Sequence, residues 1–511
     1  MDQSSKTHEA DLAADLAADL AALLPHWPDR SSSLRDPLAA GVGQGLYGAL
    51  RDAILAGRLA PGARLPASRS LAAALGVARG TVVGAYEQLV AEGYLTARIG
   101  DGTRVSADLP DSQLALSPPR SAMSSAPPAP ASAVAPAAGM PAGWPPPVFA
   151  EGIGALDQFP LAAWNRALVH GMKAGGTDAL AVADPAGALV LRQAVAAHLV
   201  ATRAVIATPA RVLITAGAQQ ALDLACRMVI GRDEPVWVED PGYRGIRTAL
   251  GLIGARPVPV PLDADGFDPD AAEAMAPAAR SCILTPSHQY PLGMTLPLAR
   301  RLRLIDRAAA QGGWIIEDDY DSEFRYAGRP IPSLQGLDGH GRTIYIGSFS
   351  KVLAPGIRLG YLVVPEGHVA RFAEGLRALG PPSALVLQPA LARFMTDGHL
   401  GRHVRRMRAL YTRRRAAVIE AIERRVIAPQ PGRGMAISAG AGGMSLVLHL
   451  PAGTDDVALA AAMARAGMRG SALAPHFLSD ARRRPGLILG FAALPERAAD
   501  AAVARLARLI G

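Results

Sequence analysis

The hydrophobic pattern after residue 149 alternates between short apolar runs and longer segments with helical spacing. The runs are rich in apolar and β-branched residues and lie at 212–215, 236–239, 281–285, 314–318 and 343–347. Helical segments begin near Ala218 and Pro297, after the first and the third of these runs. Apolar runs separated by helices are typical of a mainly parallel sheet with helices on both faces. The pattern therefore predicts an α/β domain over 149–511, and in such sheets ligands bind at the carboxyl ends of the strands.

Residues 46–106 show a different pattern, that of three short helices followed by a hairpin. The expected elements are helices at 46–57, 68–75 and 78–92 and strands at 94–98 and 103–106. Pro61-Gly62 separates the first two helices, Gly76 lies between the second and the third, and Gly100-Asp101-Gly102 joins the strands. Two short helices around a glycine turn, followed by a hairpin, predict a winged helix-turn-helix over 45–107.

The segments on either side of this module lack a pattern that could build a core. Residues 1–24 repeat the motif Asp-Leu-Ala-Ala, which suits either a helix with an acidic stripe or a disordered segment, so 1–44 is a leader without an assigned role. Residues 108–148 are rich in proline, alanine and serine and carry almost no charge, which is typical of a semi-extended linker.

Composition sets limits on the class of protein. A chain of 511 residues exceeds what one hydrophobic core usually serves, so two domains are expected. The net charge of +8 does not by itself establish nucleic-acid binding, and the basic residues are almost all arginine, because the lysines are only Lys6, Lys173 and Lys351. The two cysteines, Cys226 and Cys282, are too few for a disulfide framework and match no metal-ligand spacing. We therefore expect a reducing compartment and no metal site.

The sequence gives no sign of export or of membrane insertion. Asp11, Asp15 and Asp19 interrupt any apolar segment that could serve as a secretory signal. The longest apolar stretch, around 126–148, is broken repeatedly by proline and cannot cross a membrane. A cytoplasmic protein without membrane contact is expected.

The helical module contains the stretch LPASRSLAAALGVARGTVVGAYEQLVAEGYL. This stretch, and essentially all of 46–106, closely resembles the GntR family of winged-helix regulators. The resemblance implies that the third helix enters the major groove of double-stranded DNA with its N-terminal end, where Arg79 and Thr81 face base edges or phosphates. The residues that would hold phosphates are Arg69, Arg98 and Arg104. The residues that would pack inward are Val82, Ala85 and Leu89.

The alternative is that these arginines are ordinary solvated charges on a small interaction domain. The pattern as a whole favours DNA binding. One such module makes few contacts with DNA, so useful affinity and specificity require two modules that read spaced operator half-sites. A homodimer is therefore expected.

The segment 343–361 contains IYIGSFSKVLAPGIRLGY and brings several reactive groups together. A strand leads to hydroxyls at Ser348 and Ser350, then to Lys351, and Arg358 follows seven residues later. A lysine amine condenses with an aldehyde, while hydroxyls and a guanidinium hold a phosphate dianion. A lone lysine is usually a solvated surface charge, but this one follows an apolar strand in a chain with few lysines. The parts suit a phosphorylated aldehyde cofactor.

The sequence around this lysine resembles the class I aminotransferase fold, and the resemblance covers about 150–511. It implies that Lys351 carries pyridoxal 5'-phosphate (PLP) as a Schiff base. In IIEDDYDSEFRY, Asp318 resembles the carboxylate that pairs with the pyridine nitrogen, and Tyr320 would lie near the phenolic oxygen of the ring. The alternative, an acidic residue at the start of a loop, has more weight for Asp319 and Asp321 than for Asp318.

Three further segments match the same fold. ITAGAQQALDLACRMV opens a helix after a strand, and its backbone N–H groups suit a phosphate. The residues concerned are Gly217, Ala218 and Gln219. In WVEDPGYRG, Tyr243 matches an aromatic residue that stacks on the ring, although a tyrosine is often only a half-buried core residue. TPSHQYPLG offers His288 or Tyr290 where the family has an asparagine near the ring hydroxyl, and the choice stays open.

A winged helix, a proline-rich linker and an aminotransferase-like domain in this order resemble the MocR subgroup of GntR regulators. The resemblance runs through nearly the whole chain after residue 44. It implies a transcription regulator whose PLP domain senses PLP or an amino compound and thereby alters DNA binding, because a ligand shifts an equilibrium by its different affinity for two states. The alternatives are a PLP-dependent aminotransferase with an appended DNA-binding domain, and a domain that has lost PLP and only dimerises. Retention of Lys351, Asp318 and Arg358 disfavours the last.

Two departures from the aminotransferase pattern favour regulation over turnover. Class I enzymes have an arginine for the substrate carboxylate just before a terminal strand-like segment, but here ARRRPGLILGFAAL has Ile488 and Leu489 in that place and its arginines at 482–484. In LAVADPAG, Val182 or Ala183 stands where relatives have an aromatic residue that reaches the phosphate of the neighbouring subunit. Both changes weaken catalysis more than they weaken cofactor retention.

Overall fold

The computed structural model describes residues 39–98, 102–107, 147–176, 184–326, 332–380, 385–438 and 440–511. The chain divides into two compact units, residues 1–133 and 134–511, and each is considered by itself. The predicted leader, most of the predicted linker and positions 182 and 183 lie outside the described residues.

The N-terminal unit contains the elements that the sequence predicted for 46–106. They are α2 (Ala39–Leu55), α3 (Ser68–Leu75), α4 (Arg79–Ala91), β1 (Leu95–Arg98) and β2 (Gly102–Val105). The first helix begins seven residues before the expected start at 46, although its buried positions, among them Leu46 and Leu50, are those of the predicted apolar stripe. Gly76 ends α3 with φ 69°, a conformation that glycine adopts without strain. The two strands pair antiparallel, as a wing requires.

The larger unit contains an eight-stranded sheet with the strand order β3-β10-β9-β8-β7-β4-β5-β6. Its strands are β3 (Val212–Thr215), β4 (Pro235–Asp240), β5 (Arg256–Asp263), β6 (Gly266–Phe267), β7 (Ser281–Leu284), β8 (Ile315–Asp319), β9 (Thr343–Ser348) and β10 (Gly360–Val363). Strands β9, β8, β7, β4 and β5 are parallel, whereas β10 is antiparallel to both of its neighbours and β6 is antiparallel to β5. The predicted mainly parallel α/β sheet is confirmed.

The helices of this unit cover the sheet or form its C-terminal part. They are α5 (Leu161–Gly175), α6 (Leu189–Arg203), α7 (Ala218–Val229), α8 (Arg244–Ile253), α9 (Pro269–Met275), α10 (Leu298–Gln311), α11 (Leu334–Leu337), α12 (Phe349–Val352), α13 (Val369–Ala378), α14 (Leu387–Thr396), α15 (His399–Ile422), α16 (Asp456–Arg465) and α17 (Glu496–Ile510). Short helical turns are η2 (Leu156–Gln158), η4 (Pro355–Ile357), η5 (Glu366–His368), η6 (Glu423–Ile427), η7 (Ala474–His476) and η8 (Asp480–Arg482).

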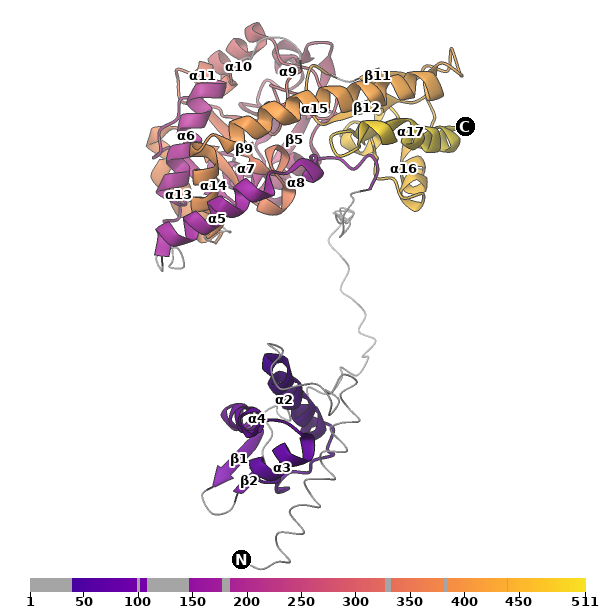
Figure 1. Cartoon of the computed structure of the whole chain (residues 1–511). Helices are drawn as coiled ribbons and strands as arrows, with labels where there is room; N and C mark the ends of the chain where they lie inside the picture. Colours follow the sequence, from indigo (N-terminus) through magenta and orange to yellow (C-terminus); the bar gives the residue numbers. More distant parts are fainter. Residues whose placement is uncertain are drawn as a thin grey trace, which may run out of the picture. The chain divides into compact units, whose positions relative to one another are not determined.

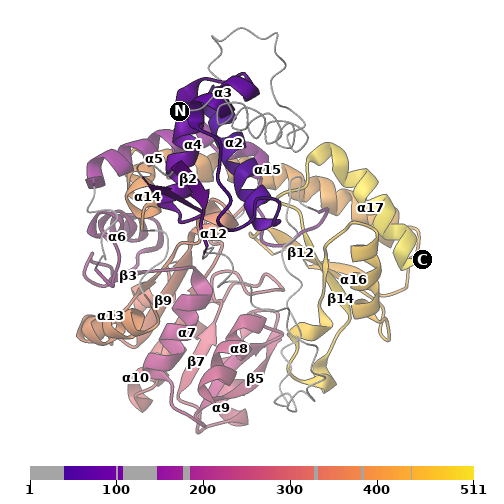
Figure 2. The same ribbon diagram turned by 90° about the horizontal axis from the view of Figure 1, so that it is seen from below.

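Side chains on the strands alternate between two apolar layers, which explains why helices lie on both faces. Ile344 and Ile346 of β9 belong to the core formed with α7, α8 and α13, whereas Tyr345 between them belongs to the core formed with α5, α6 and α14. Figure 2 shows α7 and α8 lying over the strands. Because both faces are covered, the central strands read as continuous apolar runs in the sequence.

A second, four-stranded antiparallel sheet lies in the C-terminal part, in the order β11-β12-β14-β13. Its strands are β11 (Ala436–Ser438), β12 (Ser445–His449), β13 (Ser471–Ala472) and β14 (Gly486–Gly490). Its apolar face packs against α15, α16 and α17, and Figure 1 shows α15 as a long helix that reaches this part of the unit. Sequence analysis did not predict this sheet, because two of its strands have only two or three residues.

Strand β5 was also missed, since its sequence RPVPVPLD carries three prolines. A proline cannot donate a hydrogen bond within a sheet and is confined to edge positions. Beyond β5 only the short β6 follows, paired through Leu262 and Asp263 near the end of β5. The prolines therefore lie where the strand has little pairing to lose.

Among the described residues no helix is long and apolar enough to span a membrane.

Candidate functional site

A cavity of about 180 Å³ lies at the carboxyl ends of β7, β8 and β9, beside the first turn of α7. Its lining consists of Glu151, Gly152, Ala218, Tyr243, Thr285, Tyr290, Asp318, Tyr320, Asp321, Ser348, Lys351, Met444 and Ser445. Seven of these residues were candidates from the sequence. The carboxyl edge of a parallel sheet is where such a site was expected.

Lys351 lies on the short helix α12, which follows β9 directly. Its Nζ is 3.5 Å from the carbonyl oxygen of Gly152, a long contact that binds the amine weakly. Burial lowers the pKa of the Lys351 ammonium, and the carboxylates of Glu151, Asp321 and Asp318 offset part of that effect. The cavity therefore contains a buried amine with a raised fraction of the uncharged form.

Asp318 lies near the end of β8 and is almost fully buried. Its Oδ1 has no hydrogen-bond partner among the described residues. Burial raises the pKa of the Asp318 carboxyl to about 7, and the neighbouring charges of Asp319 and Asp321 act in the same direction. A buried acceptor without a partner is costly, so this oxygen is suited to a ligand that donates a hydrogen bond.

Three tyrosine rings form one wall of the cavity. The Tyr290 ring meets the rings of Tyr243 and Tyr320 edge to face, with centroids 5.8 and 5.9 Å apart. The Tyr243 hydroxyl donates to Gln219 Oε1 at 3.3 Å, so the Gln219 side chain positions this tyrosine and does not itself line the cavity. The Tyr290 hydroxyl donates to Glu151 Oε2 at 2.8 Å.

His288 and Tyr290, the two alternatives offered by the sequence, occupy different positions. Tyr290 lines the cavity, whereas His288 lies behind Tyr320 and lines a smaller neighbouring cavity. The Nδ1 atom of His288 is 2.9 Å from the Tyr320 hydroxyl and 3.0 Å from Asp321 Oδ1. His288 thus acts on the cavity through Tyr320.

The residues proposed from sequence for a phosphate gather at the start of α7 and α12. Gly217 has φ 119°, and a Cβ at this position would lie 3.9 Å from the Arg358 guanidinium carbon. The Ser348 hydroxyl accepts a hydrogen bond from the Ser350 backbone N–H at 3.2 Å, which caps α12. Ala218 and Ser348 line the cavity, and the side chains of Arg358 and Ser350 lie outside its lining.

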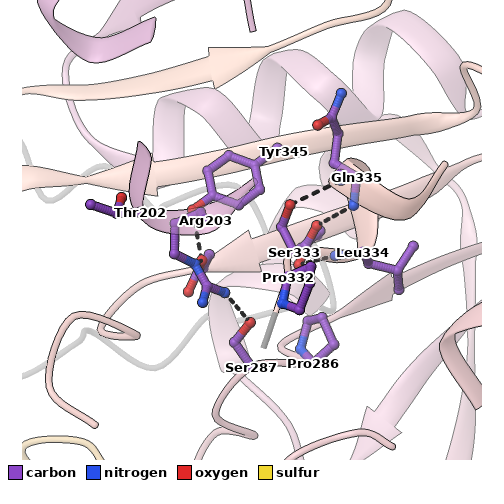
Figure 3. Close-up of polar contacts among 12 residues, drawn as sticks. Thr202, Arg203, Pro286, Ser287, Pro332, Ser333, Leu334, Gln335 and Tyr345 are labelled. Atoms are coloured by element: carbon purple, nitrogen blue, oxygen red, sulfur yellow. Dashed lines mark hydrogen bonds and ion pairs between the residues drawn. The ribbon is translucent and has the colours of Figure 1, made fainter. Parts of the chain in front are cut away.

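A buried ion pair supports the strand that carries Asp318. Arg203 at the end of α6 donates from Nε to Asp319 Oδ2 at 2.9 Å and from Nη2 to Ser287 Oγ at 2.6 Å. The Tyr345 hydroxyl donates to the same Asp319 oxygen at 2.6 Å. Figure 3 shows Arg203 between Tyr345 and Ser287. Asp319, the residue next to Asp318, is therefore held by two donors.

In the N-terminal unit, Arg69 and Arg79 are exposed near the N-terminal ends of α3 and α4. The Nε of Arg79 lies 3.4 Å from the Ser68 hydroxyl on α3. The residues expected to pack inward, Val82, Ala85 and Leu89, are buried. Two guanidinium groups thus stand outside the core on adjacent helices.

The other candidates of this unit are held closer to the domain. Thr81 is half-buried, and its methyl group lies 3.8 Å from the place of a Cβ on Gly43 of α2. Arg104 on β2 donates from Nη1 to the carbonyl oxygen of Gly62 at 3.2 Å. Arg98 ends β1, and its side chain lies outside the described part of the chain.

Sequence reasoning missed several residues of the cavity. Glu151 and Gly152 lie before α5, and Met444 and Ser445 lie at the start of β12. No local sequence motif indicates these four residues, because they reach Lys351 only through contacts between segments that are distant in the sequence. Asp321 was part of a segment already considered, but its sequence gave no reason to prefer it.

Comparisons with known families match both units. The profile described as "Aminotransferase class I and II" matches residues 150–471, and that of "Bacterial regulatory proteins, gntR family" matches residues 43–105. The "Probable rhizopine catabolism regulatory protein MocR" of Rhizobium meliloti is 36% identical over 88% of this chain and 90% of its own length. The "HTH-type transcriptional regulator TauR" of Rhodobacter capsulatus is 36% identical over 90% of this chain and 94% of its own.

Solved structures resemble the larger unit. A Pyrococcus horikoshii kynurenine aminotransferase, solved with PMP, shares 26% identity with a TM-score of 0.65 over 71% of this chain and 90% of its own. LysN, an α-aminoadipate aminotransferase of Thermus thermophilus complexed with N-(5'-phosphopyridoxyl)-L-leucine, shares 29% identity with a TM-score of 0.64 over 71% and 91%. With the two full-length regulators, these matches show that the chain belongs to the MocR subgroup of GntR-type regulators, which join a winged helix-turn-helix to a class I aminotransferase-like domain.

Proposed function

We propose that this protein is a transcription regulator that holds PLP at Lys351 and changes its affinity for DNA when PLP, or an amino compound together with it, fills the cavity. One observation carries the proposal. The Lys351 amine and the partnerless Asp318 oxygen line the same cavity, in a chain whose other unit is a winged helix-turn-helix. A buried amine and a buried carboxylate are the two groups that PLP needs at opposite ends of its ring.

The cavity residues fit the cofactor. Asp318 Oδ1 suits the protonated pyridine nitrogen, because it is a buried acceptor without a partner. The Tyr243 ring suits stacking, and Tyr320, supported by His288, suits the phenolic oxygen together with Tyr290. The groups proposed for the phosphate are the backbone of Gly217, Ala218 and Gln219 and the side chains of Ser348, Ser350 and Arg358. When bound, PLP supplies an aldehyde and an electron-withdrawing ring.

The protein's own groups prepare this chemistry. Burial lowers the pKa of Lys351, which raises the share of uncharged, nucleophilic Nζ at neutral pH. Burial also raises the pKa of Asp318 to about 7, so this carboxyl can hold or share a proton near neutral pH, as a partner of a protonated ring nitrogen would. The Tyr320 hydroxyl is fixed by His288 and cannot turn freely.

We further propose that Arg79 and Arg69 make the principal contacts with DNA. Both are exposed at the N-terminal ends of helices, where they can reach phosphates and base edges of the major groove. Thr81, Arg98 and Arg104 are proposed as secondary contacts. A DNA target of a bacterial regulator family implies that the protein works in the cytoplasm.

A homodimer would give the two DNA-binding modules that spaced half-sites require. Exposed apolar side chains on α5 and α6, which both pack against α14, support this proposal, because clustered exposed apolar residues are typical of a covered surface. They are Leu161, Val169, Met172, Leu189, Val190 and Val200.

The alternative, a working aminotransferase with an appended DNA-binding domain, is less well supported. Ile488, which stands where class I enzymes have the carboxylate-binding arginine, is fully buried among Val447, Leu473 and Phe477. Arg482 is engaged elsewhere, since it donates to the carbonyl oxygen of Pro259 at 3.1 Å. An amino-acid substrate would thus lack its usual anchor.

Absorbance and DNA titration together test the proposal. The purified protein should develop a visible absorption band with PLP, and its affinity for its own upstream promoter fragment should differ with and without PLP. A band with unchanged DNA affinity would move the search to amino-compound effectors. Absence of any band would refute cofactor binding, and repeated turnover of an amino donor would favour the aminotransferase.

A further inference from the structure

Glu151 is a carboxylate of the cavity that PLP binding as proposed does not use. Its Oε2 accepts the hydrogen bond from the Tyr290 hydroxyl at 2.8 Å. Its Oε1 is shielded from solvent and accepts no hydrogen bond of good geometry from the described residues, although the Ser471 hydroxyl lies close enough to lower the pKa of the carboxyl. The residue keeps some exposed surface, but this oxygen does not. An acceptor in this condition is stabilised by a ligand that donates to it.

The charge of the cavity also points to a cationic ligand. The described lining contains the carboxyl groups of Glu151, Asp318 and Asp321 but no arginine, and Lys351 is its only cation. Asp318 is assigned to the pyridine nitrogen, and Asp321 is contacted by His288. Glu151 is the carboxylate of the lining that is assigned neither to the pyridine nitrogen nor to His288.

A carboxylate on the ligand would find no arginine among the described residues that line the cavity. Ile488 and its neighbours form an apolar cluster that packs against Tyr290, on the side where class I enzymes bind the substrate carboxylate. Arg483 pairs with Asp480 at 2.5 Å, and Arg244 is exposed and outside the lining. An anion beside the Glu151 carboxylate would be repelled, whereas a cation there would be attracted.

We propose that Glu151 selects the effector, and that the effector is an amine with a second cationic, hydrogen-bond-donating group and no carboxylate, of which a linear diamine is the simplest form. One amine of such a ligand meets the cofactor, and the second donates to Glu151 Oε1. Burial raises the pKa of Glu151, with the hydroxyls of Ser471 and Tyr290 and the Lys351 amine opposing the rise, so a bound cation would restore the ionised form. This inference rests on the proposed function.

A purely structural role for Glu151 makes a different prediction. If Glu151 only held Tyr290 or balanced the charge of Lys351, its removal would change PLP uptake and would change the binding of every amine by the same factor. Selectivity between ligands is therefore the informative quantity.

The test is calorimetric titration of the PLP-loaded full chain with 1,4-diaminobutane, 4-aminobutanoate and butylamine. The wild type should bind the diamine at least about 10-fold more tightly than 4-aminobutanoate. Glu151→Gln should weaken diamine binding by about 10- to 100-fold relative to butylamine, which is the range for losing a hydrogen bond to a charged group. The matched control is Glu366→Gln at an exposed position outside the cavity, which should leave the ratios unchanged.

Each outcome has a distinct meaning. Equal or tighter binding of 4-aminobutanoate by the wild type would overturn the inference, as would an unchanged diamine-to-butylamine ratio in Glu151→Gln. The wild-type ratio decides alone if the variant takes up no PLP. PLP absorbance is recorded first, because its absence in the wild type would refute the proposed function, whereas its presence without selectivity would refute only the role of Glu151.

Discussion

The Lys351 amine lies 3.5 Å from the carbonyl oxygen of Gly152, and a Cβ at position 152 would overlap that amine. Gly152 therefore leaves the space in which the lysine Nζ stands. Gly152→Ala should reduce PLP affinity by at least about 10-fold, as judged by absorbance titration, because the amine must leave its position. Gly152 has φ 68°, so alanine also costs about 1–2 kcal/mol of stability.

Gly453→Ala is the matched control for this experiment. Gly453 has φ 83°, and nothing lies within 4 Å of the place of its Cβ. This variant should lose a similar amount of stability, measured by thermal unfolding, and keep its PLP affinity. Equal PLP affinity in both variants would contradict the spatial role of Gly152.

Lys351 should be the residue that becomes covalently labelled. Lys351→Ala should abolish the PLP adduct that borohydride reduction fixes and that mass spectrometry detects, because the buried amine is the reactive group. Lys173 is exposed on α5, and Lys173→Ala should retain the adduct. Loss of the adduct in Lys173→Ala alone would show that the site is wrongly assigned.

The fold could largely be predicted from the sequence, because buried parallel strands appear as continuous apolar runs. The apolar runs coincide with strands β3, β4, β7, β8 and β9. The antiparallel sheet was not readable, since β11 and β13 are too short to show alternation and depend on pairing with β12 and β14. Pairing of this kind is a tertiary property, and a local pattern does not contain it.

The site was readable where one segment carries several groups. Lys351 and Ser348 lie within a single segment, and Asp318 and Tyr320 lie in another, so the motifs and the family resemblance of these segments pointed to residues that line one cavity. Glu151 was not readable, because it reaches the cavity across about 200 positions of sequence from Lys351. The family resemblance also gave no role to that position.

The stability of the cofactor-free protein should depend on pH through Asp318. Burial raises the pKa of its carboxyl to about 7. The folded state is therefore favoured when this carboxyl is protonated. Its contribution is fully present below the unfolded value near 4 and is lost as the pH rises through about 7, with an upper bound of about 4 kcal/mol. The melting temperature of the wild type minus that of Asp318→Asn should therefore fall between pH 5 and pH 8.

Asp265→Asn provides the control for this pH series, because Asp265 is exposed. Its difference from the wild type should stay flat over the same range. A flat difference for Asp318→Asn as well would mean that the Asp318 carboxyl is solvated in the folded protein.

The Arg203–Asp319 pair should contribute much more to stability than a surface pair. Arg203 is 8% exposed, and its removal leaves the Asp319 carboxylate buried with fewer donors. Arg203→Ala should lower the free energy of unfolding by about 3–5 kcal/mol, measured in denaturant. Arg232 and Asp233 form an exposed pair at 3.9 Å, and Arg232→Ala should cost no more than about 1 kcal/mol. Similar losses in both variants would mean that Asp319 remains satisfied without Arg203.

Arg79 should decide both the strength and the selectivity of DNA binding. It is exposed at the start of α4, and its Nε lies 3.4 Å from the Ser68 hydroxyl of α3. Among the described residues it forms no ion pair with a carboxylate. Arg79→Ala should weaken binding to the protein's own promoter fragment by about 1–3 kcal/mol in fluorescence anisotropy. Arg58, exposed in the loop after α2, is the control, and Arg58→Ala should have a smaller effect.

The salt dependence of the same titration separates the two roles of Arg79. If Arg79 contacts only a phosphate, the slope of log affinity against log salt should fall by about 0.9 and affinity for unrelated DNA should drop equally. If Arg79 reads a base edge, binding to the promoter should fall more than binding to unrelated DNA. We expect the second result, because a helix N-terminus inserted in the major groove directs its first side chains toward base edges. Unchanged binding to both DNAs would exclude the α4 terminus as the recognition element.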